Sequence, residues 1–191
     1  GAATWLEVAP YVRVNPAGVL AVENRTDTNS KEAPIRTESA QHMVRTSSVV
    51  REVETLVADA TSWFPARGET IGNMKIKRYL RKNAVLFVSY SCPSDCTAFV
   101  DGPDTSFSRI VIDHADAIAE LKRLTSTATE FTLVESPSAG FETFVRRPAI
   151  RAVSFICSDL QNCTQADIHY QGGTRLTRDA SGVRALLSIS R

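Results

Sequence analysis

The sequence predicts an α+β fold made of two tandem ββββα units related by a pseudo-twofold axis, with one additional long helix. Three observations support this prediction: an internal repeat, two series of β-prone segments that each end in a helical pattern, and a long amphipathic pattern ahead of them. A repeat within 191 residues determines the expected architecture, because each copy should form the same supersecondary unit.

The repeat consists of Tyr79–Cys92, YLRKNAVLFVSYSC, and Phe144–Cys157, FVRRPAIRAVSFIC, which align without a gap at an offset of 65 residues. Five positions are identical and five more keep their chemical character. Beyond the cysteines the match continues with small gaps, and it ends in RIVID (109–113) in the first copy and RLTRD (175–179) in the second, each followed by a helical pattern. We interpret the repeat as a duplication, because basic dyads and cysteines recur at one offset.

The elements of the two copies follow from β-prone runs separated by turn residues. The first copy is expected to have strands at 74–80, 84–91, 97–100 and 107–112, and a helix at 114–124 that Asp113 caps. The second copy is expected to have strands at 130–135, 141–147, 149–157, 164–171 and 174–177, and a helix at 180–189 that Asp179 caps. We expect one pseudo-symmetric domain over residues 1–191, with an N-terminal region at 8–68 and repeat units at 72–124 and 130–190.

The N-terminal region has three parts. Residues 8–23 predict a hairpin, because Asn15–Gly18 supplies turn residues between two apolar runs. Residues 24–38 are polar and predict an exposed loop. Residues 39–64 predict the long helix, since apolar side chains recur every seven residues along it. This helix should dock on a sheet; the alternative is a partner helix in an oligomer.

Composition excludes little, but the distribution of charge is informative. The 22 Lys and Arg residues nearly balance 21 Asp and Glu, which gives a net charge of +1. Residues 70–94 nevertheless carry five basic residues and no acid, and residues 143–158 carry three and no acid. No apolar run is long enough for a membrane span, so no membrane partner is expected. The N-terminal stretch shows no signal peptide, and localisation stays open.

The four cysteines allow three interpretations. Cys92 with Cys96, and Cys157 with Cys163, flank predicted turns and could form one disulfide in each copy, which would indicate an oxidising compartment. A zinc site is the second interpretation, although these spacings are loose for zinc. Buried free thiols are the third. Two glycosylation sequons begin at Asn24 and Asn162, and they matter only for a secreted chain.

No catalytic residues, metal site or cofactor are expected. The three histidines are His42, His114 and His169, and none accompanies a recognisable nucleophile. The sequence lacks a glycine-rich phosphate loop, a His-Glu-x-x-His motif and a Gly-x-Ser-x-Gly motif. The sequence therefore does not indicate an enzyme.

The basic strands indicate single-stranded nucleic-acid binding, since phosphates bind cations and unpaired bases stack on aromatic rings. In the first copy the expected contacts are Lys75, Lys77, Arg78, Tyr79, Arg81 and Lys82. In the second copy they are Arg146, Arg147 and Arg151. The alternative is that these charges only keep an exposed sheet soluble.

Three segments carry a family resemblance. Residues 72–90, GNMKIKRYLRKNAVLFVSY, resemble the central hairpin in the first half of the Whirly proteins and the related mitochondrial guide-RNA-binding proteins of kinetoplastids. Residues 109–124, RIVIDHADAIAELKRL, resemble the strand-to-helix closure of that family. Residues 11–23 lie where Whirly proteins carry a Lys-Gly-Lys-Ala-Ala-Leu motif, but here Asn15–Leu20 reads NPAGVL. The helix at 39–64 is an insertion relative to the plant pattern.

The resemblance implies a protein that binds single-stranded RNA or DNA across sheet surfaces, a role in organellar RNA processing, a mitochondrial location and a tetramer, either homomeric or mixed. A half-open β unit with apolar strands such as AVLFVSYS also has edges that prefer a partner, which favours an oligomer. The competing class is a secreted or viral β-rich structural or shell domain with one disulfide in each copy.

Overall fold

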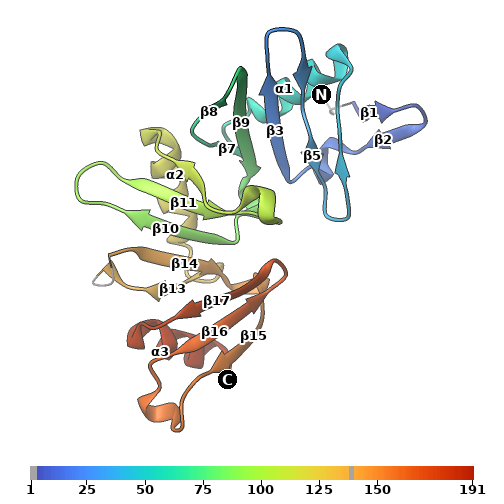
Figure 1. Cartoon of the computed structure of the whole chain (residues 1–191). Helices are drawn as coiled ribbons and strands as arrows, with labels where there is room; N and C mark the ends of the chain where they lie inside the picture. Colours follow the sequence, from blue (N-terminus) through green and yellow to red (C-terminus); the bar gives the residue numbers. More distant parts are fainter. Residues whose placement is uncertain (1–3, 138–139) are drawn as a thin grey trace. The chain divides into compact units, whose positions relative to one another are not determined.

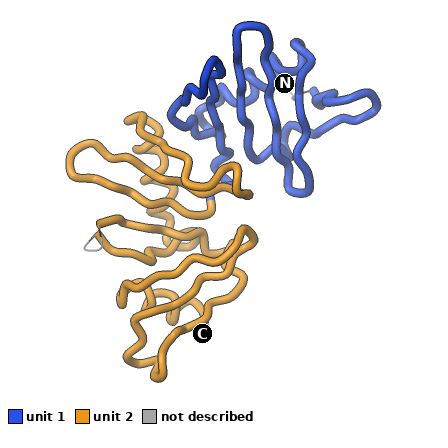
Figure 2. Tube along the Cα trace, in the orientation of Figure 1, with its two compact units in different colours: residues 1–85 blue, residues 86–191 orange. Residues whose placement is uncertain are grey.

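The computed structural model describes residues 4–137 and 140–191. The chain divides into two compact units, Gly1–Val85 and Leu86–Arg191, which Figure 2 colours separately. The boundary lies inside the stretch 72–124 that we expected to form one repeat unit. The α+β class is confirmed, because antiparallel strands combine with the helices α1 (Ser47–Val57), α2 (Ala115–Thr125) and α3 (Ala180–Ile189).

Unit 1 is built on a seven-stranded sheet (Figure 1), with the path β6-β5-β3-β9-β7, β4 beside β3 and β8 beside β9. Its strands are β3 (Ala21–Thr26), β4 (Lys31–Glu32), β5 (Ile35–Arg36), β6 (Gln41–His42), β7 (Trp63–Pro65), β8 (Glu69–Ile71) and β9 (Met74–Arg81). A separate hairpin joins β1 (Leu6–Ala9) and β2 (Val12–Val14). The longest strand, β9, pairs with three others and organises this unit.

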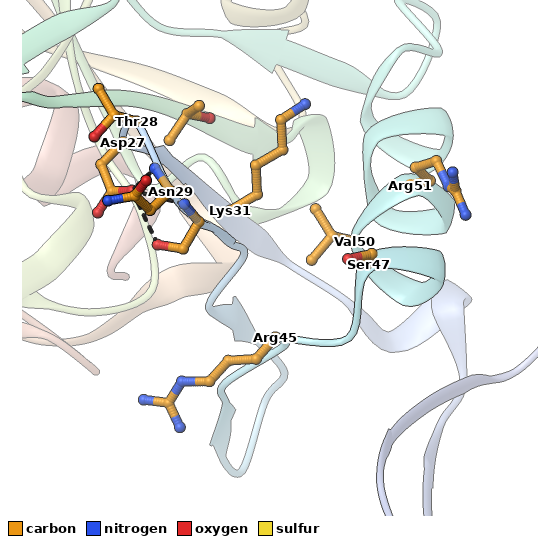
Figure 3. Close-up of a pocket in the computed structure, with 10 residues that line it drawn as sticks. Asp27, Thr28, Asn29, Lys31, Arg45, Ser47, Val50 and Arg51 are labelled. Carbon is orange, nitrogen blue, oxygen red and sulfur yellow. Dashed lines mark hydrogen bonds between the residues drawn. The ribbon is translucent and has the colours of Figure 1, made fainter.

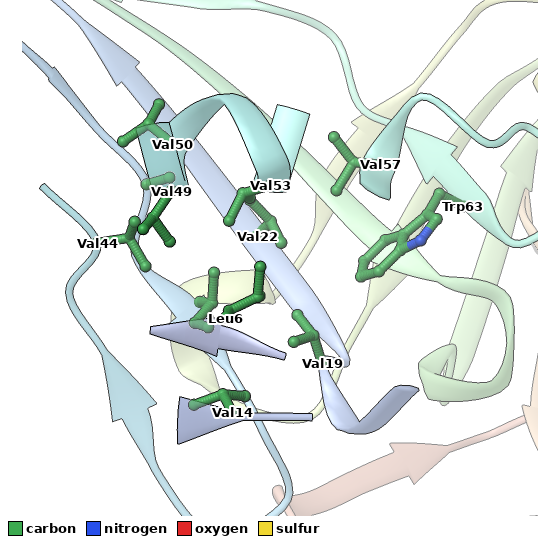
Figure 4. Packing of buried hydrophobic residues seen from close by; sticks show 12 residues of the cluster. Leu6, Val14, Val19, Val22, Val44, Val49, Val50, Val53, Val57 and Trp63 are labelled. Carbon is green, nitrogen blue, oxygen red and sulfur yellow. The ribbon is translucent and has the colours of Figure 1, made fainter. Parts of the chain in front are cut away.

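The core of unit 1 lies under α1 (Figure 4). The valines at helix positions 49, 50, 53 and 57 form one buried stripe, as expected for a helix that covers a sheet. They pack with Leu6 and Val14 from the hairpin, Val22 from β3 and Trp63 from β7. The amphipathic pattern was therefore assigned correctly to a docked helix.

The predicted length of that helix was wrong, because α1 has 11 residues rather than spanning 39–64. Residues 41–42 form β6 beside β5, and residues 63–65 form β7 beside β9. Apolar residues at a seven-residue spacing fit a helix, yet only the central part of the pattern is helical. The flanks instead satisfy their backbone groups by pairing with other strands, β6 with the preceding β5 and β7 with β9 further along the chain.

Two more predictions for the N-terminal region were wrong. The expected loop at 24–38 contains the end of β3 and all of β4 and β5, with Ala33 and Ile35 fully buried. The expected hairpin turn at Asn15–Gly18 is a 3₁₀ turn, and β2 pairs with β1 rather than with β3. A polar composition concealed these strands, because β4 contains no apolar residue and β5 contributes only Ile35 to the core.

Unit 2 contains a five-stranded sheet in the order β12-β11-β10-β14-β13 and a three-stranded sheet in the order β15-β16-β17. The strands are β10 (Phe87–Ser91), β11 (Thr97–Asp101), β12 (Ile110–Ile112), β13 (Phe131–Glu135), β14 (Glu142–Arg146), β15 (Ile150–Phe155), β16 (Ala166–Tyr170) and β17 (Gly173–Thr177). Helix α2 lies on the face of the larger sheet that carries Tyr90, whose hydroxyl lies 2.9 Å from Thr125 Oγ1. A shared core joins both sheets and α3 through Phe87, Ile168 and Leu186.

The strands predicted after residue 74 all have counterparts, and both predicted helices start and end within about one residue of α2 and α3. Asp179 caps α3 as predicted, because its Oδ1 accepts a hydrogen bond from Ser181 N at 3.1 Å. The predicted cap at Asp113 is wrong, since His114 occupies the N-cap position of α2. The four strands of each expected unit do not share one sheet: β9 lies in unit 1 while β10–β12 lie in unit 2.

The structure decides between the three interpretations of the cysteines. Cys92 is bonded to Cys96 across the β10–β11 turn, and Cys157 is bonded to Cys163 across the β15–β16 turn. Each copy therefore carries one disulfide, at the corresponding position between two paired strands.

Candidate nucleic-acid interface

Three lysines project from one face of the unit 1 sheet. Thr26 on β3 pairs with Lys31 on β4 and with Lys75 on β9, so both lysines lie on the face that carries Thr26. Lys77 lies two residues further along β9, opposite Asn24, and side chains two apart share a face. All three lysines are exposed. We call Lys31, Lys75 and Lys77 the lysine face.

The spacing within the lysine face follows from sheet geometry. Neighbouring strands lie about 4.8 Å apart and alternate residues about 6.7 Å apart, so the three Cα atoms fall within roughly 10 to 12 Å. Three exposed ammonium groups this close attract an anion with several charges more strongly than any one of them does. The arrangement suits neighbouring phosphates of one strand.

Two turns position these lysines. After β3 the chain reverses at Asp27, whose Oδ1 accepts hydrogen bonds from Asn29 N at 2.8 Å and Ser30 N at 2.7 Å. These backbone hydrogen bonds lower the pKa of the Asp27 carboxyl. The β8–β9 turn contains Gly72 at φ +60, a conformation that glycine adopts without strain.

Local acids compensate the lysine face only weakly. Lys31 Nζ lies 3.7 Å from Glu54 Oε1 on α1, and both side chains are at least 40% exposed. An ion pair this exposed contributes about 0 to 1 kcal/mol and can open at little cost. Lys77 Nζ lies 5.6 Å from the centre of the Tyr79 ring, which adds a weak cation–π contact.

Tyr79 is only partly available as a stacking platform. Its ring packs against the α1 core, and this burial, together with the nearby Glu54 carboxylate, raises the pKa of its hydroxyl. The part of the ring beside Lys77 stays on the lysine face.

The other predicted contacts of the first copy stabilise unit 1. Arg78 points to the opposite face, where it forms ion pairs with Glu23 at 2.9 Å and Glu69 at 3.1 Å. Arg81 donates hydrogen bonds to Val19 O at 2.6 Å and Pro16 O at 2.9 Å. Its guanidinium also lies 4.4 Å from the Trp63 ring, and burial lowers its pKa.

Lys82 directly follows β9 and is partly buried. It lies in the 3₁₀ turn Lys82–Ala84, with its Nζ 5.3 Å from the Phe64 ring. The structure thus separates the six residues predicted for the first copy into an exposed group and a structural group.

The second copy shows the same separation. Arg146 forms an ion pair with Glu130 at 3.0 Å, its side chain is 13% exposed, and burial lowers its pKa although Glu130 opposes this. Arg147 donates a hydrogen bond to Ala128 O at 3.0 Å. Arg151 is exposed on β15. Arg147 and Arg151 line an open groove of about 430 Å³ that Ile150 and Ile189 also line.

A hollow of about 560 Å³ adjoins the lysine face (Figure 3). It lies between the β3–β4 turn and the start of α1, and Lys31, Arg45 and Arg51 contribute its cationic groups. These three side chains point in different directions, and Arg45 pairs with Glu32 at 3.3 Å. The hollow therefore extends the positive surface but does not hold one anion between converging groups.

Charge is distributed unequally between the units. Residues 1–85 contain 12 Lys or Arg and 9 Asp or Glu, which gives a net charge of +3 with histidine neutral. Residues 86–191 contain 10 and 12, which gives −2. The overall charge of +1 conceals this difference, and unit 1 is the better candidate for binding anions.

Lys31 is the residue that sequence analysis missed, because residues 24–38 were interpreted as a loop. The available signal was the turn-forming Asp27–Ser30 segment followed by KEAPIR, in which polar and apolar residues partly alternate.

The described residues offer no metal site and no membrane-spanning helix. Within 4–137 and 140–191, no cluster of three or more His, Cys, Asp or Glu side chains is arranged to hold a metal ion. In the same ranges, no helix combines the length and apolar character that a membrane span requires.

His169 lies on the open face of the three-stranded sheet, where Nε2 is 2.8 Å from Ser154 Oγ and Nδ1 is 3.2 Å from Thr174 Oγ1.

Comparison with known proteins finds no matching family model, no matching curated protein and no matching solved structure.

Proposed function

We propose that the protein binds single-stranded RNA or DNA, and that the lysine face of unit 1 contacts the phosphate backbone. The observation that carries this proposal is the placement of three lysines on one sheet face, with Lys31 and Lys75 on either side of Thr26 and Lys77 two residues further along β9. Lysine ammonium groups are flexible point charges that contact phosphates without reading bases. Binding should therefore depend strongly on salt and weakly on sequence.

The partly exposed ring of Tyr79 supports single strands over duplexes. It lies beside Lys77 on the same face, and only an unpaired base can place its flat side against an aromatic ring. Arg147 and Arg151 form a second, smaller candidate contact in unit 2. We expect three arginines to stabilise the fold rather than bind nucleic acid, because their side chains already bind groups of the protein: Arg78, Arg81 and Arg146.

The test is fluorescence anisotropy of labelled single-stranded RNA and DNA oligomers across a salt series. Three phosphate contacts predict a log–log slope of about 2, since each contact on a single strand contributes about 0.7. The double variant Lys75→Ala/Lys77→Ala should lower the slope by about 1.4 and weaken binding to all sequences alike.

A matched control removes the same charge elsewhere. Arg13 on β2 and Arg184 on α3 are exposed and lie outside the lysine face, so Arg13→Ala/Arg184→Ala should leave the slope nearly unchanged. Equal weakening by the two double variants would mean diffuse attraction. Salt-insensitive binding, or none, by the unmutated protein would refute the proposal.

We further propose that the two copies derive from a duplication. The order strand, 3₁₀ turn, strand, disulfide, two strands and helix occurs in β9–β12 with α2 and again in β14–β17 with α3. An experimental structure in which residues 74–124 and 130–190 superpose about a pseudo-twofold axis would support the Whirly-like arrangement. If the two segments superpose but no twofold axis relates them, the duplication would hold and the Whirly-like arrangement would be contradicted.

A second candidate function is a β-rich structural domain of a secreted protein or a virion. Both cysteine pairs are bonded, and such disulfides persist in oxidising compartments rather than in a reducing organelle matrix. Maleimide labelling of denatured, unreduced protein from its native source distinguishes the compartments. No labelled thiol would favour this candidate, whereas four would favour the mitochondrial location.

A further inference from the structure

The two disulfides occupy corresponding positions in the repeat but lie in different surroundings. Cys157–Cys163 is anchored in the core of unit 2, because Cys163 is 5% exposed and packs with Ala166, Ile168 and Leu186. Cys92–Cys96 lies on the surface, where Cys92 is exposed and Cys96 is half-buried. The difference determines which sulfur a thiolate can reach and which can leave.

Reduction of Cys157–Cys163 is disfavoured at either sulfur. Core residues cover Cys163, so a thiolate can approach only the exposed Cys157. The leaving group would then be a Cys163 thiolate in apolar surroundings, which raise the pKa of a thiol and make it a poor leaving group.

Cys92–Cys96 has a cation at its leaving sulfur. Lys122 reaches from α2 to place its Nζ 3.1 Å from Cys96 Sγ. The same ammonium lies 5.9 Å from the centre of the Tyr90 ring, which helps to position it. A neighbouring ammonium lowers the pKa of a thiol and stabilises its thiolate.

We propose that Cys92–Cys96 is a thiol–disulfide exchange site whose substrates are thiols, and that Cys157–Cys163 is structural. A thiolate attacks Cys92 Sγ and forms a mixed disulfide with it. The Cys92–Cys96 bond breaks, and its electron pair leaves on Cys96 Sγ beside Lys122. A second thiolate attacks the sulfur of the first thiol, releasing the Cys92 thiolate. Two thiols become one disulfide, and their two electrons and two protons pass to the protein, so that Cys92 and Cys96 end as thiols.

The test measures the reduction rate of each disulfide in the folded protein. Dithiothreitol is the probe, samples are quenched with iodoacetamide, and mass spectrometry quantifies alkylation of each cysteine over time. Cys92 and Cys96 should be alkylated at least about tenfold faster than Cys157 and Cys163. In denaturant the two disulfides should react at similar rates, because tertiary structure causes the difference.

Variants of exposed helix residues isolate the role of the cation. Lys122→Met should slow reduction of Cys92–Cys96 several-fold, and Lys122→Arg should restore most of the rate. Arg123→Met is the matched control, because Arg123 is the next residue on α2 and its guanidinium binds Glu120 instead. Equal rates for both disulfides in the folded protein would overturn the proposal, as would equal effects of Lys122→Met and Arg123→Met.

Discussion

Gly182 allows α3 to approach β13 at backbone distance, and replacing it with alanine tests the packing of unit 2. A Cβ atom at this position would lie 2.0 Å from Val134 O and 2.6 Å from Val134 C. Ordinary van der Waals contact begins at about 3.4 Å, so the helix and strand would separate by more than about 1 Å. Both groups are backbone, and no side-chain rotation relieves the contact.

Two opposing effects determine the magnitude for Gly182→Ala. Gly182 is the third residue of α3, where alanine favours the helix over glycine by at most about 1 kcal/mol. Against this, overpacking typically costs about 1 to 3 kcal/mol, and separation of α3 also loosens Val183 and Leu186, both fully buried. We take the upper part of that range and expect a net loss of about 2 kcal/mol in the free energy of unfolding.

Urea unfolding followed by far-ultraviolet circular dichroism measures this loss. Both tryptophans, Trp5 and Trp63, lie in unit 1, so tryptophan fluorescence gives a separate readout of that unit. The control is Ser188→Ala at an exposed position of α3, which should be neutral or slightly stabilising. If Gly182→Ala is as stable as the wild type, the close approach of α3 to β13 is wrong.

Three further predictions concern a helix cap, an ion pair and assembly. Burial raises the pKa of Asp179, but hydrogen bonds from Ser136 and Ser181 outweigh it, so the folded pKa is lowered. The stabilisation by the Asp179 carboxylate is therefore present above about pH 4 and is lost as pH falls through the folded pKa. Asp179→Ala should cost about 1 kcal/mol at pH 7. Urea titrations at several pH values should also show a flatter dependence of stability on pH for this variant. Arg175→Met removes the ion-pair partner, at 3.2 Å, of the buried Asp101 carboxylate and should cost about 3 kcal/mol in urea unfolding. The double variant Arg175→Met/Asp101→Asn should cost clearly less, and equal losses would contradict the pairing. Light scattering at micromolar concentration should give a multiple of 20.9 kDa, and a monomeric mass would contradict the proposed oligomer.

Patterns local in sequence determined the elements after residue 74. Period-two strands, turn residues and the Asp179 cap depend on neighbours a few positions away, so α3 and the strands of both copies could be predicted from the sequence. The same local reasoning failed at residues 24–38 and 39–64. There, the short segments β5 and β7 become strands because β3 and β9 offer them backbone partners.

The candidate site was decided by tertiary structure. Sequence grouped nine residues because they are basic or aromatic and close together along the chain. Pairing of β3 with both β4 and β9 instead brings Lys31 beside Lys75, and it turns Arg78 to the opposite face toward Glu23. A cationic side chain binds an external anion only if the fold does not already pair it with carboxylates or carbonyl oxygens of the protein. That depends on contacts between residues distant in sequence, which composition and spacing do not encode.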